Sequence, residues 1–165
     1  MGVFGNSICA AFLVVGSSMI ASPASSAGRC WSEAEQASAR VRDLQTKFMV
    51  ASLQCQAREP AVLAAYNRFV VAHRAAIGRH NDAIRGYFIT TQGRAGERGY
   101  DRFTTSLANT HGLQTSAVSD CREMIPVIQA ATKSSAAQLA ALAESMGADP
   151  KLPGGACKVR IASRR

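Results

Sequence analysis

The feature that most constrains the fold is a helical pattern that runs from Ser32 to Cys55, in a helix predicted at about 32–57. Ser32 and Glu35 have the spacing of a capping box, in which each side chain satisfies a backbone N–H group of the first turn. The apolar residues of this helix form one narrow stripe. Such a stripe is typical of a bundle seam, although it also suits a helix that binds a partner. The apolar residues recur at steps of three and four, which places them on one helical face: Ala34, Ala37, Val41, Leu44, Phe48, Ala51 and Cys55.

The same spacing recurs in three later segments. Pro60 suits the first turn of a helix, because its missing N–H would be unpaired there, and Gly112 suits a helix end. The chain has no strand alternation and only short links between the helical segments. The sequence therefore predicts an all-α fold, an up-down four-helix bundle. The three further helices are predicted at about 60–88, 97–111 and 117–146.

Three features leave details of these helices open. Gly78 weakens the second helix, so its continuity is not settled by the pattern. Pro126 either kinks the fourth helix or marks a late start. Residues 90–99 contain three glycines and resemble a phosphate-binding loop only superficially, since no Gly-Lys-Ser/Thr ending follows. We interpret them as a flexible loop between helices.

The N-terminus has the composition of a secretory signal. An apolar run is followed by small residues at Ser25 and Ala27, which predicts a signal peptide over 1–27 with cleavage after Ala27. The first basic residue is Arg29, so the positive charge usual at the start of a signal is missing, and a retained anchor is the alternative. The apolar run is too short and interrupted for a stable membrane span. The mature helical domain is then 28–165, periplasmic or secreted.

The cysteines predict two disulfides. Four remain after the signal peptide, and three pairings are possible in principle. In an up-down bundle, the end of the first helix lies level with the start of the fourth. This geometry favours Cys55 with Cys121 and Cys30 with Cys157. A redox or metal site is the alternative, but no Cys-x-x-Cys or zinc spacing is present.

The net charge of +8 indicates possible partners. Arg68 and Arg79 share one face of the second predicted helix, as do Arg74 and Arg85, and the tail 147–165 ends in basic residues. Such charge suits an anionic envelope surface or a periplasmic protein partner, and also suits a simple solvated face. Nucleic acid is not expected for an exported chain. The sequence predicts a structural or binding role in the cell envelope, with no cofactor.

Few residues suggest chemistry. His73 and His80 lie two turns apart, about 10 Å, which is too far to bind one ion directly. Asp101 suits an ion pair that fixes the third helix, or a carboxylate base. His111 stands at a helix end, where its cationic form is favoured, and Trp31 is expected to pack over the nearby disulfide. We assign no catalytic, cofactor or metal residue; the alternative is a small periplasmic enzyme or metal protein that uses His73, His80 or Asp101.

Several segments resemble a family of small exported helical proteins from alphaproteobacteria. They cover most of the mature chain up to Cys121. Some members of that family carry the label S-adenosylhomocysteine hydrolase. This chain has no strand followed by Gly-x-Gly-x-x-Gly and is too short for a two-domain NAD enzyme. The resemblance implies export and the cysteine framework, and no site residue. The similar segments are Cys30-Trp31, VRDLQTKFMVASLQC ending on Cys55, YNRFV at 66–70, Asn81, and YDRFTTSLAN at 100–109.

Overall fold

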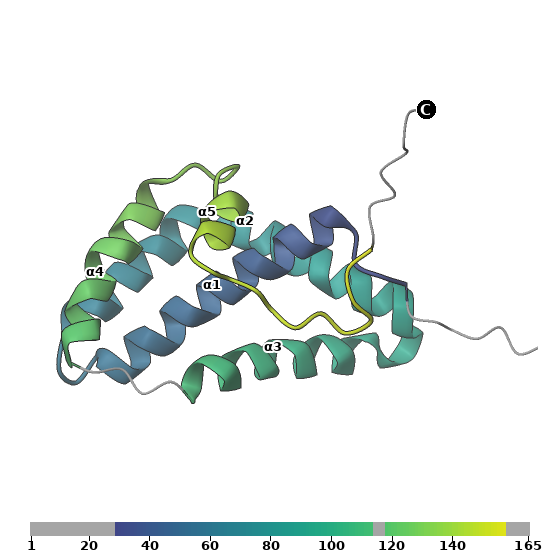
Figure 1. The fold of residues 1–165 in the computed structure, drawn as a ribbon, viewed down its shortest axis with the longest axis horizontal. Helices are drawn as coiled ribbons and strands as arrows, with labels where there is room; N and C mark the ends of the chain where they lie inside the picture. Colours follow the sequence, from purple (N-terminus) through teal and green to yellow (C-terminus); the bar gives the residue numbers. More distant parts are fainter. Residues whose placement is uncertain (1–28, 114–117, 158–165) are drawn as a thin grey trace, which may run out of the picture.

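A computed structural model describes residues 29–113 and 118–157. The described chain is helical, and successive long helices run in alternating directions, as predicted for an up-down bundle (Figure 1). The predicted signal peptide and its cleavage after Ala27 lie outside the described residues. The elements are α1 Glu33–Cys55, α2 Pro60–Gln92, the short 3-10 helix η1 Gly93–Ala95, α3 Gly96–Gly112, α4 Val118–Lys133 and α5 Leu139–Ser145.

Helix α1 begins at the predicted capping box. The Ser32 hydroxyl accepts from the Glu35 N–H, and the Glu35 carboxylate accepts from the Ser32 N–H at 2.8 Å. The seam residues from Val41 onward, including Leu44 and Phe48, are buried, as expected for a core face, whereas Ala34 in the first turn is exposed. The stripe is therefore the inner face of the bundle and not a docking surface.

Helix α2 is continuous through Gly78 and spans 33 residues. At 1.5 Å per residue it is about 50 Å long, and the other helices of the described chain are shorter. A Cβ atom at Gly78 or Gly86 would meet nothing within 4 Å. The helix extends beyond the predicted end at 88 and stops at Gly93, whose φ of 53° favours glycine.

The other helices pack on the hairpin formed by α1 and α2. Helix α3 lies along the second half of α2, and α4 lies along its first half (Figure 1). The core accordingly has two clusters. One includes Phe48 and Phe69 and is completed by α4 and α5, whereas the other surrounds Trp31 and includes Phe88 and Phe103. Each end of the bundle is therefore packed around its own cluster.

The prediction of one continuous fourth helix over 117–146 is wrong. Helix α4 ends at Lys133, and α5 begins only at Leu139. The interruption falls on polar residues, Ser134 and Ser135. The Ser134 hydroxyl donates to the Ala131 carbonyl at 2.7 Å, and the Gln138 side chain accepts from the Ser135 N–H at 2.9 Å. These local bonds replace helical ones.

Pro126 lies inside α4 without ending it. The segment predicted as a flexible loop is also helical, because α2 runs to Gln92 and α3 starts at Gly96. Two of its three glycines serve packing: a Cβ at Gly96 would lie 2.6 Å from the Ile89 Cα, and one at Gly99 would lie 2.3 Å from the Gln92 side chain. Glycine here permits close contact between α2 and α3.

Both predicted disulfides are confirmed. Cys55 at the end of α1 is bonded to Cys121 in α4, with the Cα atoms 5.6 Å apart. Cys30 is bonded to Cys157, with the Cα atoms 4.9 Å apart. The second bond holds residues 147–157, which we call the strap, against the start of α1 (Figure 1). The strap crosses from α5 to the far end of the bundle. Within the described ranges, no helix is long and apolar enough to cross a membrane.

Candidate functional site

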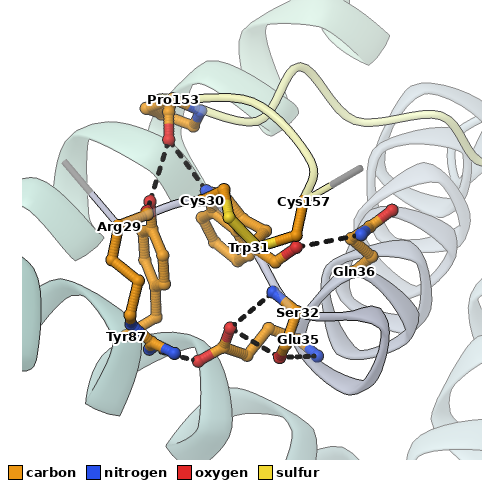
Figure 2. Close-up of a disulfide and its surroundings, with 9 residues drawn as sticks. All are labelled: Arg29, Cys30, Trp31, Ser32, Glu35, Gln36, Tyr87, Pro153 and Cys157. Atoms are coloured by element: carbon orange, nitrogen blue, oxygen red, sulfur yellow. Dashed lines mark hydrogen bonds and ion pairs between the residues drawn. A yellow bond between two sulfur atoms is a disulfide. The ribbon is translucent and has the colours of Figure 1, made fainter. Parts of the chain in front are cut away.

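The disulfide between Cys30 and Cys157 lies in a cluster of contacts that we call the clasp (Figure 2). The clasp consists of this disulfide and of Arg29, Trp31, Glu35, Tyr87 and Pro153. Trp31 has an exposed fraction of 0% and its ring stacks on Tyr87 with the centroids 3.9 Å apart. Its indole N–H donates to the Pro153 carbonyl at 2.8 Å. Trp31 is therefore a buried packing residue between Tyr87 and the strap, next in the chain to the disulfide-bonded Cys30.

Charged groups complete the clasp. Arg29 pairs with Glu35 at 2.5 Å, and its guanidinium lies 5.3 Å from the centre of the Tyr87 ring. Burial alone would raise the pKa of Glu35, but hydrogen bonds from Ser32 and from Arg29 hold it below its ordinary value. Burial raises the pKa of Tyr87, whose hydroxyl donates to the Arg29 carbonyl at 2.6 Å. The clasp is a structural device with its polar groups satisfied.

His73 is a core residue. It is 5% exposed, and its Nε2 lies 3.0 Å from the Ala131 carbonyl of α4. A carbonyl only accepts, so the ring donates there and ties α2 to α4. Its ring centre lies 5.1 Å from that of Phe69. These contacts leave His73 in a packing role.

His80 joins α2 to α1. Its Nδ1 lies 3.0 Å from the Ser38 hydroxyl, which itself lies 2.9 Å from the Ala34 carbonyl. Burial, and secondarily the charge of Arg79, lower the pKa of His80, so the folded protein favours the neutral ring. A neutral, hydrogen-bonded imidazole between two helices is again a structural element.

Asp101 lies exposed on α3. The ion pairs of the described residues do not include it; α3 is instead fixed by Arg85 with Glu97, at 2.8 Å, and by Asp43 with His111, at 2.7 Å. Among residues 29–113 and 118–157, no group of three or more histidines, cysteines or carboxylates could hold a metal ion. The structure therefore does not bring His73, His80 and Asp101 into one site.

The pair of Asp43 and His111 is the contact that the sequence pattern missed. Asp43 is not one of the predicted seam residues of α1, but it is buried, with a side chain only 9% exposed. Its Oδ1 lies 2.7 Å from the Nε2 of His111, in the last turn of α3. The available signal was an aspartate directly beside the seam residue Leu44, together with a histidine at a predicted helix end.

Four exposed arginines lie on the outer side of α2, which we call the arginine face: Arg68, Arg74, Arg79 and Arg85. Val71 lies among them and is 65% exposed. Only Arg85 has a carboxylate partner among the ion pairs of the described residues. The face can therefore offer cations to an anionic surface.

Comparisons with known proteins found no matching family model, curated protein or solved structure.

Proposed function

We propose that the protein is an exported helical binding protein, periplasmic or secreted, that contacts anionic lipid headgroups of the cell envelope through its arginine face. Two disulfides indicate an oxidising compartment outside the cytoplasm. The net charge of +8 agrees with an anionic partner. The observation that carries the proposal is the set of exposed cations on one side of the longest helix.

The geometry of α2 suits a flat contact. Arg68 and Arg79 are eleven positions apart and differ by about 20° around the helix, and the same holds for Arg74 and Arg85. The two rows are therefore parallel to the axis and each about 16 Å long. Between them lie the small exposed side chains of Val71 and Ala75 and one exposed carboxylate, Asp82. Small residues allow the flanking arginines to reach one plane.

The expected energy is modest but measurable. A basic residue near an anionic membrane contributes about 1 kcal/mol, and the contribution falls with added salt. Three arginines of the face, Arg68, Arg74 and Arg79, have no carboxylate partner among the described ion pairs. Their removal should therefore weaken binding by about 3 kcal/mol, or roughly a hundredfold.

The test is co-sedimentation with vesicles of phosphatidylglycerol and phosphatidylcholine, against vesicles of phosphatidylcholine alone. We expect binding to the anionic vesicles at about 0.05 M salt and its loss at about 0.5 M. The variant R68Q/R74Q/R79Q should lose binding. The matched control is R94Q/R98Q/R102Q, which removes the same charge from exposed positions in η1 and α3.

Equal losses in the two variants would show that net charge alone drives binding and would remove the arginine face from the proposal. No binding of the unmodified protein at low salt would remove the lipid surface as the partner. Binding to an anionic polysaccharide that greatly exceeds binding to the vesicles would also contradict it.

A further inference from the structure

A cavity of about 310 Å³ lies between α1, α3 and the strap. Its wall contains Asp43 from α1 and His111 from α3, and its other side contains Asp149 and Lys151 from the strap. The volume falls in the range of sites for small ligands. The cavity is separate from the arginine face on the outer side of α2.

The most informative group in the wall is the carboxylate of Asp43. Its side chain is only 9% exposed, so it is more than nine-tenths buried. The Oδ1 atom is hydrogen-bonded to His111. The Oδ2 atom has no hydrogen bond among those of the described residues, and it is not one of the fully buried atoms that lack a partner. Asp43 lines the cavity, so a ligand bound there would bring its donors to this carboxylate. A largely buried carboxylate oxygen is stabilised by such a donor.

The neighbouring polar groups are also acceptors. The Ser106 hydroxyl donates to the Phe103 carbonyl at 2.7 Å, and the Thr110 hydroxyl donates to the Ser106 carbonyl at 2.9 Å. Their protons are used within α3, so their oxygens are left to accept. Asp149 adds a second carboxylate, and the C-terminal end of α3 adds partial negative charge. This set of acceptors matches an ammonium group.

One cation and two apolar residues define the rest of the ligand. Lys151 lines the cavity and can pair with a carboxylate, while Leu107 and Pro150 offer apolar contact. The ion pairs of residues 29–113 and 118–157 include neither Asp149 nor Lys151. Both charges are exposed on the strap and remain available to a ligand.

We infer that this cavity binds a small zwitterionic amine, of the class of a free amino acid with an aliphatic side chain. The ammonium group of the ligand lies between Asp43 and Asp149. It donates hydrogen bonds to both carboxylates and to the hydroxyl oxygens of α3. The ligand carboxylate faces Lys151. The side chain contacts Leu107 and Pro150. The strap forms part of the wall, so its attachment through Cys157 also preserves the site.

The test is a titration of the full mature protein with L-valine, in which binding is measured by calorimetry and by changes in amide chemical shifts. Two analogues each lack one charge: L-valinol has no carboxylate, and N-acetyl-L-valine has no ammonium. Each should bind about tenfold weaker or worse, because a charge-assisted hydrogen bond is lost. The shifted amides should include those of Thr110 and Gly147, which line the cavity.

Variants of the strap provide the second arm. D149N and K151Q should each weaken L-valine binding by about tenfold. The controls E144Q and K133Q remove the same charges from exposed positions outside the cavity and should bind as the unmodified protein does. The variant R68Q/R74Q/R79Q should also bind L-valine normally, so failure on vesicles and failure here are distinguishable.

Three results would overturn the inference. One is the absence of saturable L-valine binding to the unmodified protein. Another is equal binding of L-valine and either analogue, which would mean that the cavity does not recognise a zwitterion. The third is a loss in D149N or K151Q that the two control variants reproduce, since binding would then depend on net charge and not on the strap.

Discussion

Asp43 and His111 are joined by a contact of 2.7 Å between α1 and α3, across 68 positions of the chain. Both side chains are largely buried, with exposed fractions of 9% and 13%. The contact fixes the C-terminal end of α3 on the bundle, where the following residues lead to α4. It also holds the wall of the cavity beneath the strap.

Replacing His111 with glutamine should therefore destabilise the fold. We expect the free energy of unfolding to fall by about 1.5–3 kcal/mol, the range for hydrogen bonds to charged groups. Urea unfolding at neutral pH measures it. The control is D101N on the same helix, where the exposed carboxylate should matter by less than about 0.5 kcal/mol. Equal effects of the two changes would contradict the role of the buried pair.

The glycines of α2 and α3 should respond oppositely to alanine. G96A places a Cβ atom 2.6 Å from the Ile89 Cα, so backbone must move and stability should fall. G86A meets nothing within 4 Å in a helical segment and should stabilise the protein by about 0.5–1 kcal/mol. Thermal and urea unfolding of both variants checks this. A stabilised G96A would show that the two helices are not in close contact.

His80 should make stability fall at mildly acidic pH. Its pKa is lowered in the folded protein, chiefly by burial and then by Arg79. As pH falls below the ordinary value of 6.5, the unfolded chain takes up a proton that the folded chain resists. The contribution of His80 is thus present above pH 6.5 and is lost as pH falls toward the lowered pKa.

The measurement is urea unfolding of the unmodified protein and of H80N between about pH 8 and about pH 5. Asparagine does not titrate and can keep a polar group near Ser38. The unmodified protein should lose more stability over this range than H80N does. Parallel curves would mean that His80 titrates alike in the folded and unfolded chains.

The two disulfides should differ in their local effects. Loss of Cys55–Cys121, in C55S/C121S, should cost about 4 kcal/mol, and loss of Cys30–Cys157 about 5 kcal/mol, from the chain lengths that they close. Only C30S/C157S should speed exchange of the Trp31 amide, which donates to the Gly155 carbonyl at 2.9 Å. Similar exchange at Trp31 in both variants would show that the strap is held without its disulfide.

Local patterns were enough to predict much of this fold. The capping box and the seam of α1 rest on spacings within one helix, and the structure has both. The disulfide pairing followed from one further step, because antiparallel neighbours bring the end of one helix to the start of another. The break between α4 and α5 was missed because polar residues such as Ser134 and Ser135 also occur within continuous helices.

The candidate sites were harder to predict from the sequence. His73 and His80 attract attention in the sequence, yet both are occupied by contacts with other helices. Asp43 attracts little, yet it faces a cavity built from three distant segments. A residue's chemistry depends on what lies opposite it, and spacing along one helix does not carry that information.

The sequence by itself determined the all-helical fold, the inner face of α1, the oxidising compartment implied by paired cysteines and the basic charge. Each of these follows from residues near one another in the chain or from composition. Only the tertiary structure decided that Gly96 and Gly99 serve close helix packing, that Asp43 is buried against His111, and that the strap covers a cavity. Those features depend on distances between segments far apart in the chain, which are set by the packing of the whole bundle.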